Sequence, residues 1–260
     1  MKHNISPHEV SQIKQRIITR FIKNVKGKKS NTKGSNIRHD GKDGHWLEKQ
    51  MGVKHNASNK PDIDGFEMKN NTTSKTTFGD WSADYYIFSK DSSYGITRSE
   101  FLKLFGKPNL QKKGRLSWSG EPCPKIGPYN SFGQKLTIDS GGNTSALYSF
   151  KADKRTNKHK LIPKKMQRGV IVLAKWNAQS MKRKLEEKFN QLGWFKCVKN
   201  KEGVYTQIVF GDPYNFKKWI KAVQRGVVFF DSGMYETNKR PYSQWRASNA
   251  YWDSLITSKY

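Results

Sequence analysis

A stretch between residues 59 and 70 carries two carboxylates and one ammonium group in a compact pattern, Asp62, Glu67 and Lys69. If a strand begins at Phe66, its side chains alternate between two faces, so Glu67 and Lys69 share one face. Two carboxylates can hold Mg²⁺, which keeps several waters and takes further ligands from a substrate phosphate. The bound ion can activate a water against a phosphodiester, and an ammonium group can position that water.

Local features of this stretch decide which carboxylate we assign beside Glu67. Asp62 follows Pro61, and the chain can bend at Gly65 before the expected strand, whereas Asp64 lacks a preceding proline and fits the strand pattern less well. Asp62 is therefore the candidate ligand. A strand edge whose charged residues have no catalytic role fits the same spacing, so the neighbouring residues must decide between the two interpretations.

The preceding segment, 44–52, predicts a short helix that Gly52 closes. Apolar residues, among them Leu47 and Met51, give this helix an apolar side. Glu48 directly follows the first of these apolar residues and could face the same cleft as the two carboxylates. A third carboxylate would then border the site.

Together the two segments resemble the PD-(D/E)xK nucleases, most closely the branch of the MutH mismatch-repair nickase and the MvaI/BcnI-type restriction endonucleases. The matching features are the helix with Leu47-Glu48 and Gly52, the pair Pro61-Asp62, and Glu67-x-Lys69 after a gap of four residues. MutH has a longer gap, so the restriction enzymes are the nearer match. The resemblance covers 44–70, extends to Lys90, and includes a few positions over 226–246.

The resemblance implies a mixed α/β fold, with a restriction-endonuclease-like core sheet flanked by helices and an interleaved DNA-recognition lobe. It implies a type II restriction endonuclease, a hydrolase that cuts a short specific double-stranded DNA site and leaves 5′-phosphate and 3′-hydroxyl ends. The reaction would depend on Mg²⁺ held by Asp62, Glu67 and the backbone carbonyl of Met68. Lys69 would orient and activate the water, and Glu48 would assist through a metal-bound water or a second ion.

The charge of the chain independently indicates a polyanionic partner. Its formal net charge is +28, from 49 Lys and Arg against 21 Asp and Glu, which is typical of nucleic-acid binding. A membrane-surface role is disfavoured because no long amphipathic apolar face accompanies that charge. Apolar residues make up only 34% of the chain, so 14 Phe, 11 Tyr and 8 Trp must supply much of the core.

Cysteine, histidine and hydropathy patterns disfavour several other classes. Cys123 and Cys197 are isolated, so they indicate neither a disulfide framework nor a zinc site, and the six His residues show no metal-ligand spacing. No apolar run approaches the roughly 18 residues of a transmembrane helix, and the N-terminus lacks the apolar core of a signal peptide. We expect a cytoplasmic protein without a membrane partner.

Hydrophobic periodicity predicts the elements that must position these residues. Apolar residues recur at helical spacing over 7–25, and a polar, basic loop over 25–43 follows. A second strand over 84–89 is expected to pair antiparallel with the strand that begins at Phe66. Further along we expect a helix over 96–105, strands over 115–118, 134–138, 170–175, 203–210 and 226–231, and helices over 180–192 and 212–224. Residues 232–260 are expected to be irregular.

Basic segments later in the chain are expected to contact DNA. Residues 148–168 hold eight Lys and Arg against one Asp, and we expect Lys164, Lys165 and Arg168 to meet backbone phosphates. Lys112, Lys113 and Arg115 are interleaved with Trp118 and Tyr129, aromatic residues that could stack on bases or anchor loops in the core.

Base readout is placed in residues 231–246, the readout segment. Four residues of this segment belong to types that read base edges: Lys239, Arg240, Gln244 and Arg246. Arg240 and Arg246 fit contact with phosphate or solvent equally well, so both interpretations stay open.

We expect one nuclease unit over 1–260 with two lobes that interleave in the sequence and hold double-stranded DNA between them. The catalytic lobe would comprise about 1–95 with parts of 150–200, and the recognition lobe about 100–145 with 200–260. A monomer is favoured over a homodimer, and a cognate DNA methyltransferase is the expected genetic partner. The alternatives are a nicking repair endonuclease like MutH and a non-catalytic nucleic-acid-binding protein.

Overall fold

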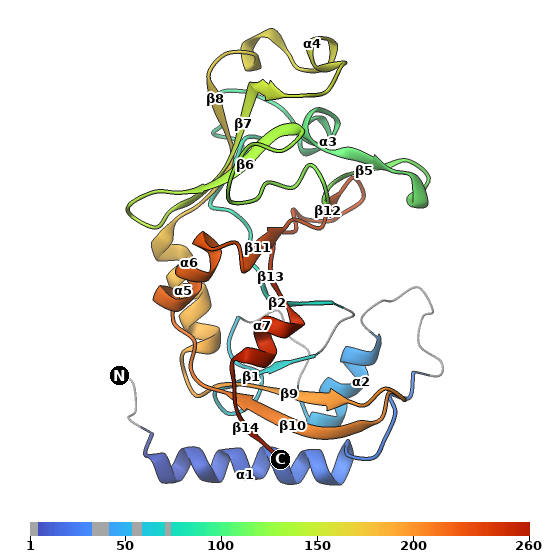
Figure 1. Ribbon diagram of the computed structural model, residues 1–260, viewed down its shortest axis with the longest axis vertical. Coiled ribbons are helices and arrows are strands. Elements are labelled where there is room, and N and C mark those ends of the chain that lie inside the picture. Colours follow the sequence, from blue (N-terminus) through green and yellow to red (C-terminus); the bar gives the residue numbers. More distant parts are fainter. Residues whose placement is uncertain (1–4, 33–41, 54–58, 71–73) are drawn as a thin grey trace. The chain divides into compact units, whose positions relative to one another are not determined.

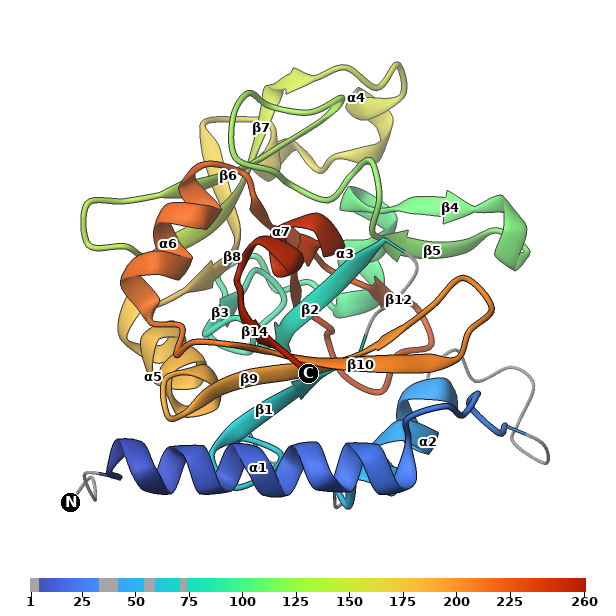
Figure 2. The ribbon, with the colours of Figure 1, turned by 60° about the horizontal axis from the view of Figure 1, so that its bottom comes forward.

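The computed structural model describes residues 5–32, 42–53, 59–70 and 74–260 (Figures 1 and 2). The chain forms two compact units. The first comprises residues 1–76, 185–215 and 249–260, and the second comprises 77–184 and 216–248. The candidate carboxylates therefore lie in the first unit.

α1 (Pro7–Asn24) forms where the helical spacing of apolar residues predicts it. A capping box holds its first turn: the Ser6 hydroxyl accepts a hydrogen bond from the Glu9 amide at 3.2 Å, and the Glu9 carboxylate accepts one from the Ser6 amide at 2.7 Å. Its apolar stripe, which includes the buried Ile17 and Phe21, faces the core of the first unit.

α2 (Lys42–Met51) confirms the second predicted helix. It ends at Gly52, whose φ of +74° lies in the left-handed region that glycine adopts without steric cost. Leu47 and Met51 are buried in the same apolar core as α1. Most of the polar loop expected before this helix, 33–41, lies outside the described residues.

A four-stranded sheet packs against these helices in the order β1-β9-β10-β14. Its strands are β1 (Phe66–Lys69), β9 (Gly193–Lys199), β10 (Tyr205–Gly211) and β14 (Ile256–Lys259). β1 runs parallel to β9, whereas β10 is antiparallel to both β9 and β14. Figure 2 shows α1 lying along one face of this sheet.

The prediction that a strand over 84–89 pairs antiparallel with β1 is wrong. The strand that pairs with β1 is β9, for which no strand was predicted. Its residues 193–197 are all buried because both of its faces are covered, so the strand shows no alternation of apolar and polar positions. Two residues of the predicted strand instead form β3 (Tyr85–Tyr86), which pairs with a strand of the second unit.

The face of the sheet opposite α1 carries the candidate site. Trp194 of β9 meets Trp252 of α7 (Asn249–Ser254) edge to face, with ring centroids 5.1 Å apart. Trp194 also lies over Gly211, its cross-strand partner, where an added Cβ would come within 2.2 Å of the indole. The prediction of an irregular C-terminal segment is wrong, since α7 and β14 form there. Both elements are too short to show a hydrophobic period, and tertiary packing of single aromatic residues stabilises them.

The second unit contains three small sheets. One has the order β3-β8-β7-β6, another β12-β5-β4, and the third β11-β13-β2. The strands are β2 (Lys75–Asp80), β4 (Lys107–Asn109), β5 (Arg115–Trp118), β6 (Phe132–Ile138), β7 (Thr144–Asp153), β8 (Val170–Trp176), β11 (Val228–Asp231), β12 (Met234–Tyr235) and β13 (Gln244–Ser248). The helices are α3 (Arg98–Phe105), η1 (Leu110–Lys112), α4 (Lys158–Leu161), η2 (Lys164–Met166), α5 (Ala178–Phe189) and α6 (Phe216–Gln224), of which α5 ends in the first unit.

Aromatic rings fill the core of the second unit, as the low apolar content of the chain requires. Trp245 meets Trp176, Trp219 and Phe230 with ring centroids 5.1–5.4 Å apart. Phe230 in turn contacts Trp118, which is fully buried. The interpretation of Trp118 as a buried anchor is therefore confirmed, and stacking of this residue on a nucleic-acid base is excluded.

Gly211→Ala should destabilise the first unit, because the added methyl group would collide with the Trp194 indole and displace it from Trp252. We expect the free energy of unfolding to fall by about 1–3 kcal/mol, as overpacked cores do. Gly44→Ala in α2 is the control: among the described residues an added Cβ meets only Asn70, at 3.5 Å, so the variant should stabilise the protein by about 0.5–1 kcal/mol. Denaturant titration followed by tryptophan fluorescence measures both, and unchanged stability for Gly211→Ala would contradict this packing.

Candidate active site

β1 brings Glu67 and Lys69 together on one face of the sheet. Phe66 and Met68 point to the opposite face, into the apolar core with α1 and α2. Lys69 Nζ lies 2.8 Å from Glu67 Oε1, and the two side chains are only 10% and 3% exposed. A carboxylate and an ammonium group are thus held in contact inside the protein, where their interaction is stronger than in water.

Asp62 reaches the same strand from the turn that precedes it. Gly65, at a φ of +90°, permits that turn, and the amide of Met68 donates a hydrogen bond to Asp62 Oδ2 at 3.0 Å. β1 is the outer strand of its sheet, so this hydrogen bond lies at its open edge. The carbonyl of a strand residue points to the same edge as its amide, so the Met68 carbonyl faces the side on which Asp62 lies.

Asp64 takes no part in this arrangement. It has a φ of +46°, and its exposed carboxylate lies 3.6 Å from the exposed guanidinium of Arg16. A surface ion pair of this kind contributes little to stability. The two carboxylates of the turn therefore have different partners, and the choice of Asp62 as the metal ligand stays a prediction.

Lys188, in the last turn of α5, is a further member of the cluster that sequence analysis missed. Its Nζ lies 3.0 Å from Glu67 Oε1, and its side chain is 16% exposed. The next residue, Phe189, presents its ring to Lys69 Nζ at 4.9 Å from the ring centroid. No local motif connects a helix end to a strand so far away in sequence, so only the folded chain identifies Lys188.

Burial dominates the protonation of Glu67 and Lys69, two members of this carboxylate–lysine cluster (Asp62, Glu67, Lys69 and Lys188). Burial raises the pKa of Glu67, the nearby Asp62 charge raises it further, and the ammonium groups of Lys69 and Lys188 lower it. Burial likewise lowers the pKa of Lys69, against the opposing effect of the Glu67 charge. A buried lysine with a lowered pKa is more readily neutral, and a neutral amine can accept a proton.

The donor atoms of the cluster fit a divalent cation. Glu67 Oε2 is buried and has no hydrogen-bond partner among the described residues, although buried carboxylate oxygens are normally satisfied. No group of three or more His, Cys, Asp or Glu within the described ranges could hold a metal ion. Two carboxylates with a backbone carbonyl are a set of hard oxygen donors that suits an ion which keeps several waters.

Lys196 borders the cluster on the adjacent strand, and Glu48 lies on α2. Lys196 of β9 pairs in register with Lys69, so it shares that face; it is 1% exposed and lies 2.5 Å from Asp253 of α7. Glu48 is half-buried on α2, directly after the buried Leu47. The role of Glu48 as an assisting carboxylate stays a prediction.

The readout segment carries a compact polar group on β11 and β13 of the second unit. Arg246 donates a hydrogen bond from Nη2 to Gln244, and its Nη1 lies 3.5 Å from the Asp231 carboxylate. Arg240 is engaged differently: its guanidinium lies 2.7 Å from Asp80 and stacks over Tyr242 at 4.5 Å. Gln244 and Arg246 thus share one face of β13, while Lys239 is exposed outside the strands.

The basic run over 148–168 contains both structural and exposed cations. Arg155 makes a bidentate ion pair with the buried Asp153, and Lys158 donates to the Phe150 and Asp153 carbonyls at 3.1 and 2.7 Å. The three predicted phosphate-binding residues, Lys164, Lys165 and Arg168, are exposed instead. Lys165 also donates to a backbone carbonyl, that of Tyr94, at 2.6 Å.

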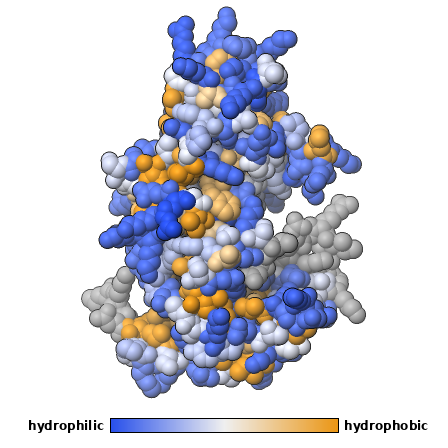
Figure 3. Space-filling model, viewed as in Figure 1, coloured by the Kyte–Doolittle hydropathy of each residue, from blue (hydrophilic) through white to orange (hydrophobic). Residues whose placement is uncertain are grey.

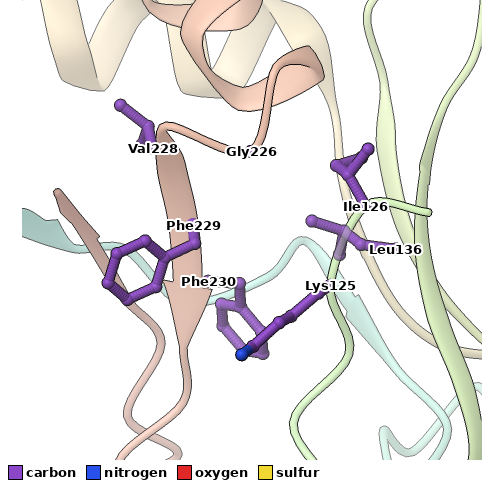
Figure 4. A pocket seen from close by; sticks show the side chains of 7 residues that line it. All are labelled: Lys125, Ile126, Leu136, Gly226, Val228, Phe229 and Phe230. Carbon is purple, nitrogen blue, oxygen red and sulfur yellow. The ribbon is translucent and has the colours of Figure 1, made fainter. Parts of the chain in front are cut away.

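A cavity of about 210 Å³ lies elsewhere, in the second unit (Figure 4). Its lining is mostly apolar and consists of Lys125, Ile126, Leu136, Gly226, Val228, Phe229 and Phe230. None of these residues belongs to the carboxylate–lysine cluster, and Lys125 is the one charged residue among them. The cavity therefore offers no set of reacting groups.

Comparison with known proteins identifies the family of this chain. The family model described as LlaMI restriction endonuclease matches residues 25–260. The chain belongs to the LlaMI restriction endonuclease family. The type II restriction enzyme ScrFI of Lactococcus lactis subsp. cremoris is 51% identical over 264 residues, which cover 94% of this chain and 97% of the relative. A structure of the restriction endonuclease MvaI with its cognate DNA substrate has a TM-score of 0.59 over 99% of both chains, at 13% identity.

Membership in the LlaMI family makes this chain a restriction endonuclease, a site-specific deoxyribonuclease. The predicted resemblance is confirmed, and so is the mixed α/β, restriction-endonuclease-like fold. Type II restriction endonucleases generally need a divalent metal ion. Across the described part of the chain, no helix has both the length and the apolar character to cross a membrane.

Lys188→Ala should move the pH–rate profile of cleavage to higher pH. Lys188 lowers the pKa of both Glu67 and Lys69, so its removal raises both values. A metal-binding Glu67 and a proton-accepting Lys69 both act deprotonated, so the rise of the cleavage rate with pH should move to higher pH. Lys182→Ala removes an exposed cation from the same helix and is the matched control. A lower rate for Lys188→Ala without displacement of the pH–rate profile would show that the residue acts through packing alone.

Proposed function

We propose that this chain is a type II restriction endonuclease that hydrolyses one phosphodiester bond in each strand of a short, specific duplex site, with Mg²⁺ as its cofactor. The observation that carries the proposal is the buried Glu67 carboxylate, one oxygen of which contacts two lysines while the other has no partner among the described residues. Asp62, Glu67 and the Met68 carbonyl would hold the ion. Bound there, Mg²⁺ would supply Lewis-acid stabilisation of the charge that develops on the phosphate.

Lys69 is the residue best placed to orient and activate the attacking water. Its amine is fixed by Glu67 at 2.8 Å and by the Phe189 ring, so its position is set before substrate binds. Because burial lowers its pKa, a larger fraction of Lys69 is neutral at a given pH and able to take the proton that the water loses. Lys188 contacts the same Glu67 oxygen at 3.0 Å. Glu48 would assist from α2.

Sequence readout would come from the readout segment, with Gln244 and Arg246 as the base-reading pair. Arg246 is preorganised by Gln244 and Asp231, as a side chain that reads a base edge must be. Arg240 and Lys239 would contact DNA beside it. Lys164, Lys165 and Arg168 would bind backbone phosphates and add affinity without specificity.

A restriction enzyme endangers the DNA of its own host, so a cognate DNA methyltransferase is the expected genetic partner, and both would act in the cytoplasm. We favour a monomer that cuts the two strands in turn. Linear plasmid as the product would support cleavage of both strands, whereas nicked circles alone would support a MutH-like nickase.

Asp62→Ala and Glu67→Gln should abolish cleavage while DNA binding persists or tightens, because each removes a metal-binding carboxylate and with it a negative charge that repels phosphate in the absence of metal. Lys69→Ala should lower the cleavage rate by at least about two orders of magnitude without loss of binding. Asp64→Ala, two residues from Asp62 in the same turn, is the control and should cleave normally. Plasmid cleavage and filter binding measure the two properties, and robust cleavage by Asp62→Ala would exclude the assignment.

Neutralising Lys164, Lys165 and Arg168 together should weaken specific and random DNA alike. The slope of log affinity against log salt should become shallower by about 0.9 for each phosphate that the variant no longer binds. The charge-conserving variant with Lys164→Arg, Lys165→Arg and Arg168→Lys is the control and should keep the original slope. An unchanged slope in the neutral variant would place these cations away from the DNA.

Arg246→Ala should cost about 1–3 kcal/mol of binding to the specific site and relax the preference at one base pair. Arg240→Ala is the comparison, since Arg240 is exposed and paired with Asp80. Binding to the specific duplex and to each single-mismatch duplex at two salt concentrations separates readout from phosphate contact. Equal weakening of all duplexes by Arg246→Ala would assign that residue to the phosphate backbone.

A further inference from the structure

The hairpin of β4 and β5 is a rigid projection of the second unit. Its two strands pair antiparallel from Lys107 with Ser117 to Asn109 with Arg115, and the short helix η1 lies at its tip. Trp118 at its base is fully buried against the aromatic core. The tip is therefore held in place by a packed base and by a paired backbone.

The hairpin continues directly from the readout segment. β5 pairs with β12, and the Arg115 guanidinium lies 3.4 Å from the centroid of the Tyr235 ring. Leu116 and Glu236 add two further hydrogen bonds: the Leu116 amide donates to Glu236 Oε2 at 2.9 Å, and the Glu236 amide donates to the Leu116 carbonyl at 3.1 Å. A surface that meets DNA along the readout segment would thus extend onto this hairpin.

The tip presents an apolar side chain among cations. Leu110 is 88% exposed, the largest value among the exposed large apolar residues of the described chain. Lys112 and Lys113 follow it, both exposed, and no Asp or Glu occurs between residues 107 and 118. Figure 3 shows an apolar spot surrounded by hydrophilic surface at the end of this hairpin.

Lys113 adopts a conformation that costs energy. Its φ is +54°, in the left-handed region, where a residue other than glycine is disfavoured by about 1–2 kcal/mol. Glycine would remove that cost, and among the described residues space is open around the tip: a Cβ on the neighbouring Gly114 would meet none of their atoms within 4 Å. Strain that a single replacement would relieve indicates a side chain kept for a function.

Resting on the DNA-cleaving function proposed above, we infer that the β4–β5 hairpin is a DNA wedge: Leu110 inserts between base steps of the bound duplex, and Lys112 and Lys113 bind the flanking phosphates. Apolar side chains that insert between base steps unstack and kink DNA in this manner. Charge complementarity selects the partner, because a cationic tip without acidic residues fits a polyanion and repels a second copy of this basic chain. The hairpin would contribute to affinity and to the deformation of the site, not to the chemistry of cleavage.

The test uses the full chain in EDTA with intact duplexes that carry its recognition site. It measures base stacking in the DNA and the affinity of the complex. The fluorescence of 2-aminopurine, placed at each position of the duplex in turn, should rise at one base step when the wild-type chain binds. Leu110→Ala should abolish that rise and bind about tenfold more weakly, as expected when a leucine surface is no longer buried. Val170→Ala, at another exposed apolar residue, is the matched control and should change neither signal.

Lys113→Gly separates function from structure at the tip. Removal of the strain should leave the thermal midpoint unchanged or raise it, while the slope of log affinity against log salt becomes shallower by about 0.9. A lower midpoint with an unchanged slope would overturn the assignment of Lys113 to phosphate.

Three results would overturn the wedge. They are the absence of any fluorescence rise with the wild-type chain, a rise that persists in Leu110→Ala, and wild-type affinity of Leu110→Ala. Sedimentation identifies the competing role: if Leu110→Ala abolishes self-association but leaves DNA binding intact, Leu110 serves contacts between copies of the chain.

Discussion

The carboxylate of Glu67 lies inside the protein, and the surrounding elements are arranged around that buried charge. Burial disfavours its ionised form, and the ammonium groups of Lys69 and Lys188 oppose this effect from contact distance. The two lysines come from different elements, a strand and a helix end, so the charge is balanced only when β1 and α5 are packed together. One carboxylate oxygen still has no partner within the described structure, and a divalent cation would supply it. A site of this kind lowers folding stability in favour of catalysis.

Charge pairing also organises the rest of this basic chain. A net charge of +28 predicts a polyanionic partner, yet several cations serve the fold. Arg155 neutralises the buried Asp153, and Lys196 pairs with Asp253 beside the site. The number of Lys and Arg in a basic run therefore overestimates the number of phosphates that the run can bind. Which cations contact DNA depends on their exposure and on whether the fold already engages them.

Local patterns in the sequence predicted the elements that local interactions stabilise. α1, α2 and the start of β1 followed from helical spacing, from the closing Gly52 and from strand alternation, and the opposite orientations of Phe66 and Glu67 followed with them. The partner strand of β1 could not be predicted, because β9 is buried on both faces and shows no period. Lys188 was missed for the same physical reason, since its role arises from a contact between elements far apart in sequence.

Anomalous diffraction from crystals of the active protein grown with Mn²⁺ tests the central claim most directly. Manganese accepts the same hard oxygen ligands as magnesium and gives a measurable anomalous signal. We predict a peak within coordination distance of Glu67 Oε2 and an Asp62 oxygen, with the Met68 carbonyl as a third protein ligand. A manganese ion bound elsewhere, with Glu67 still enclosed by Lys69 and Lys188 alone, would contradict this account of the site.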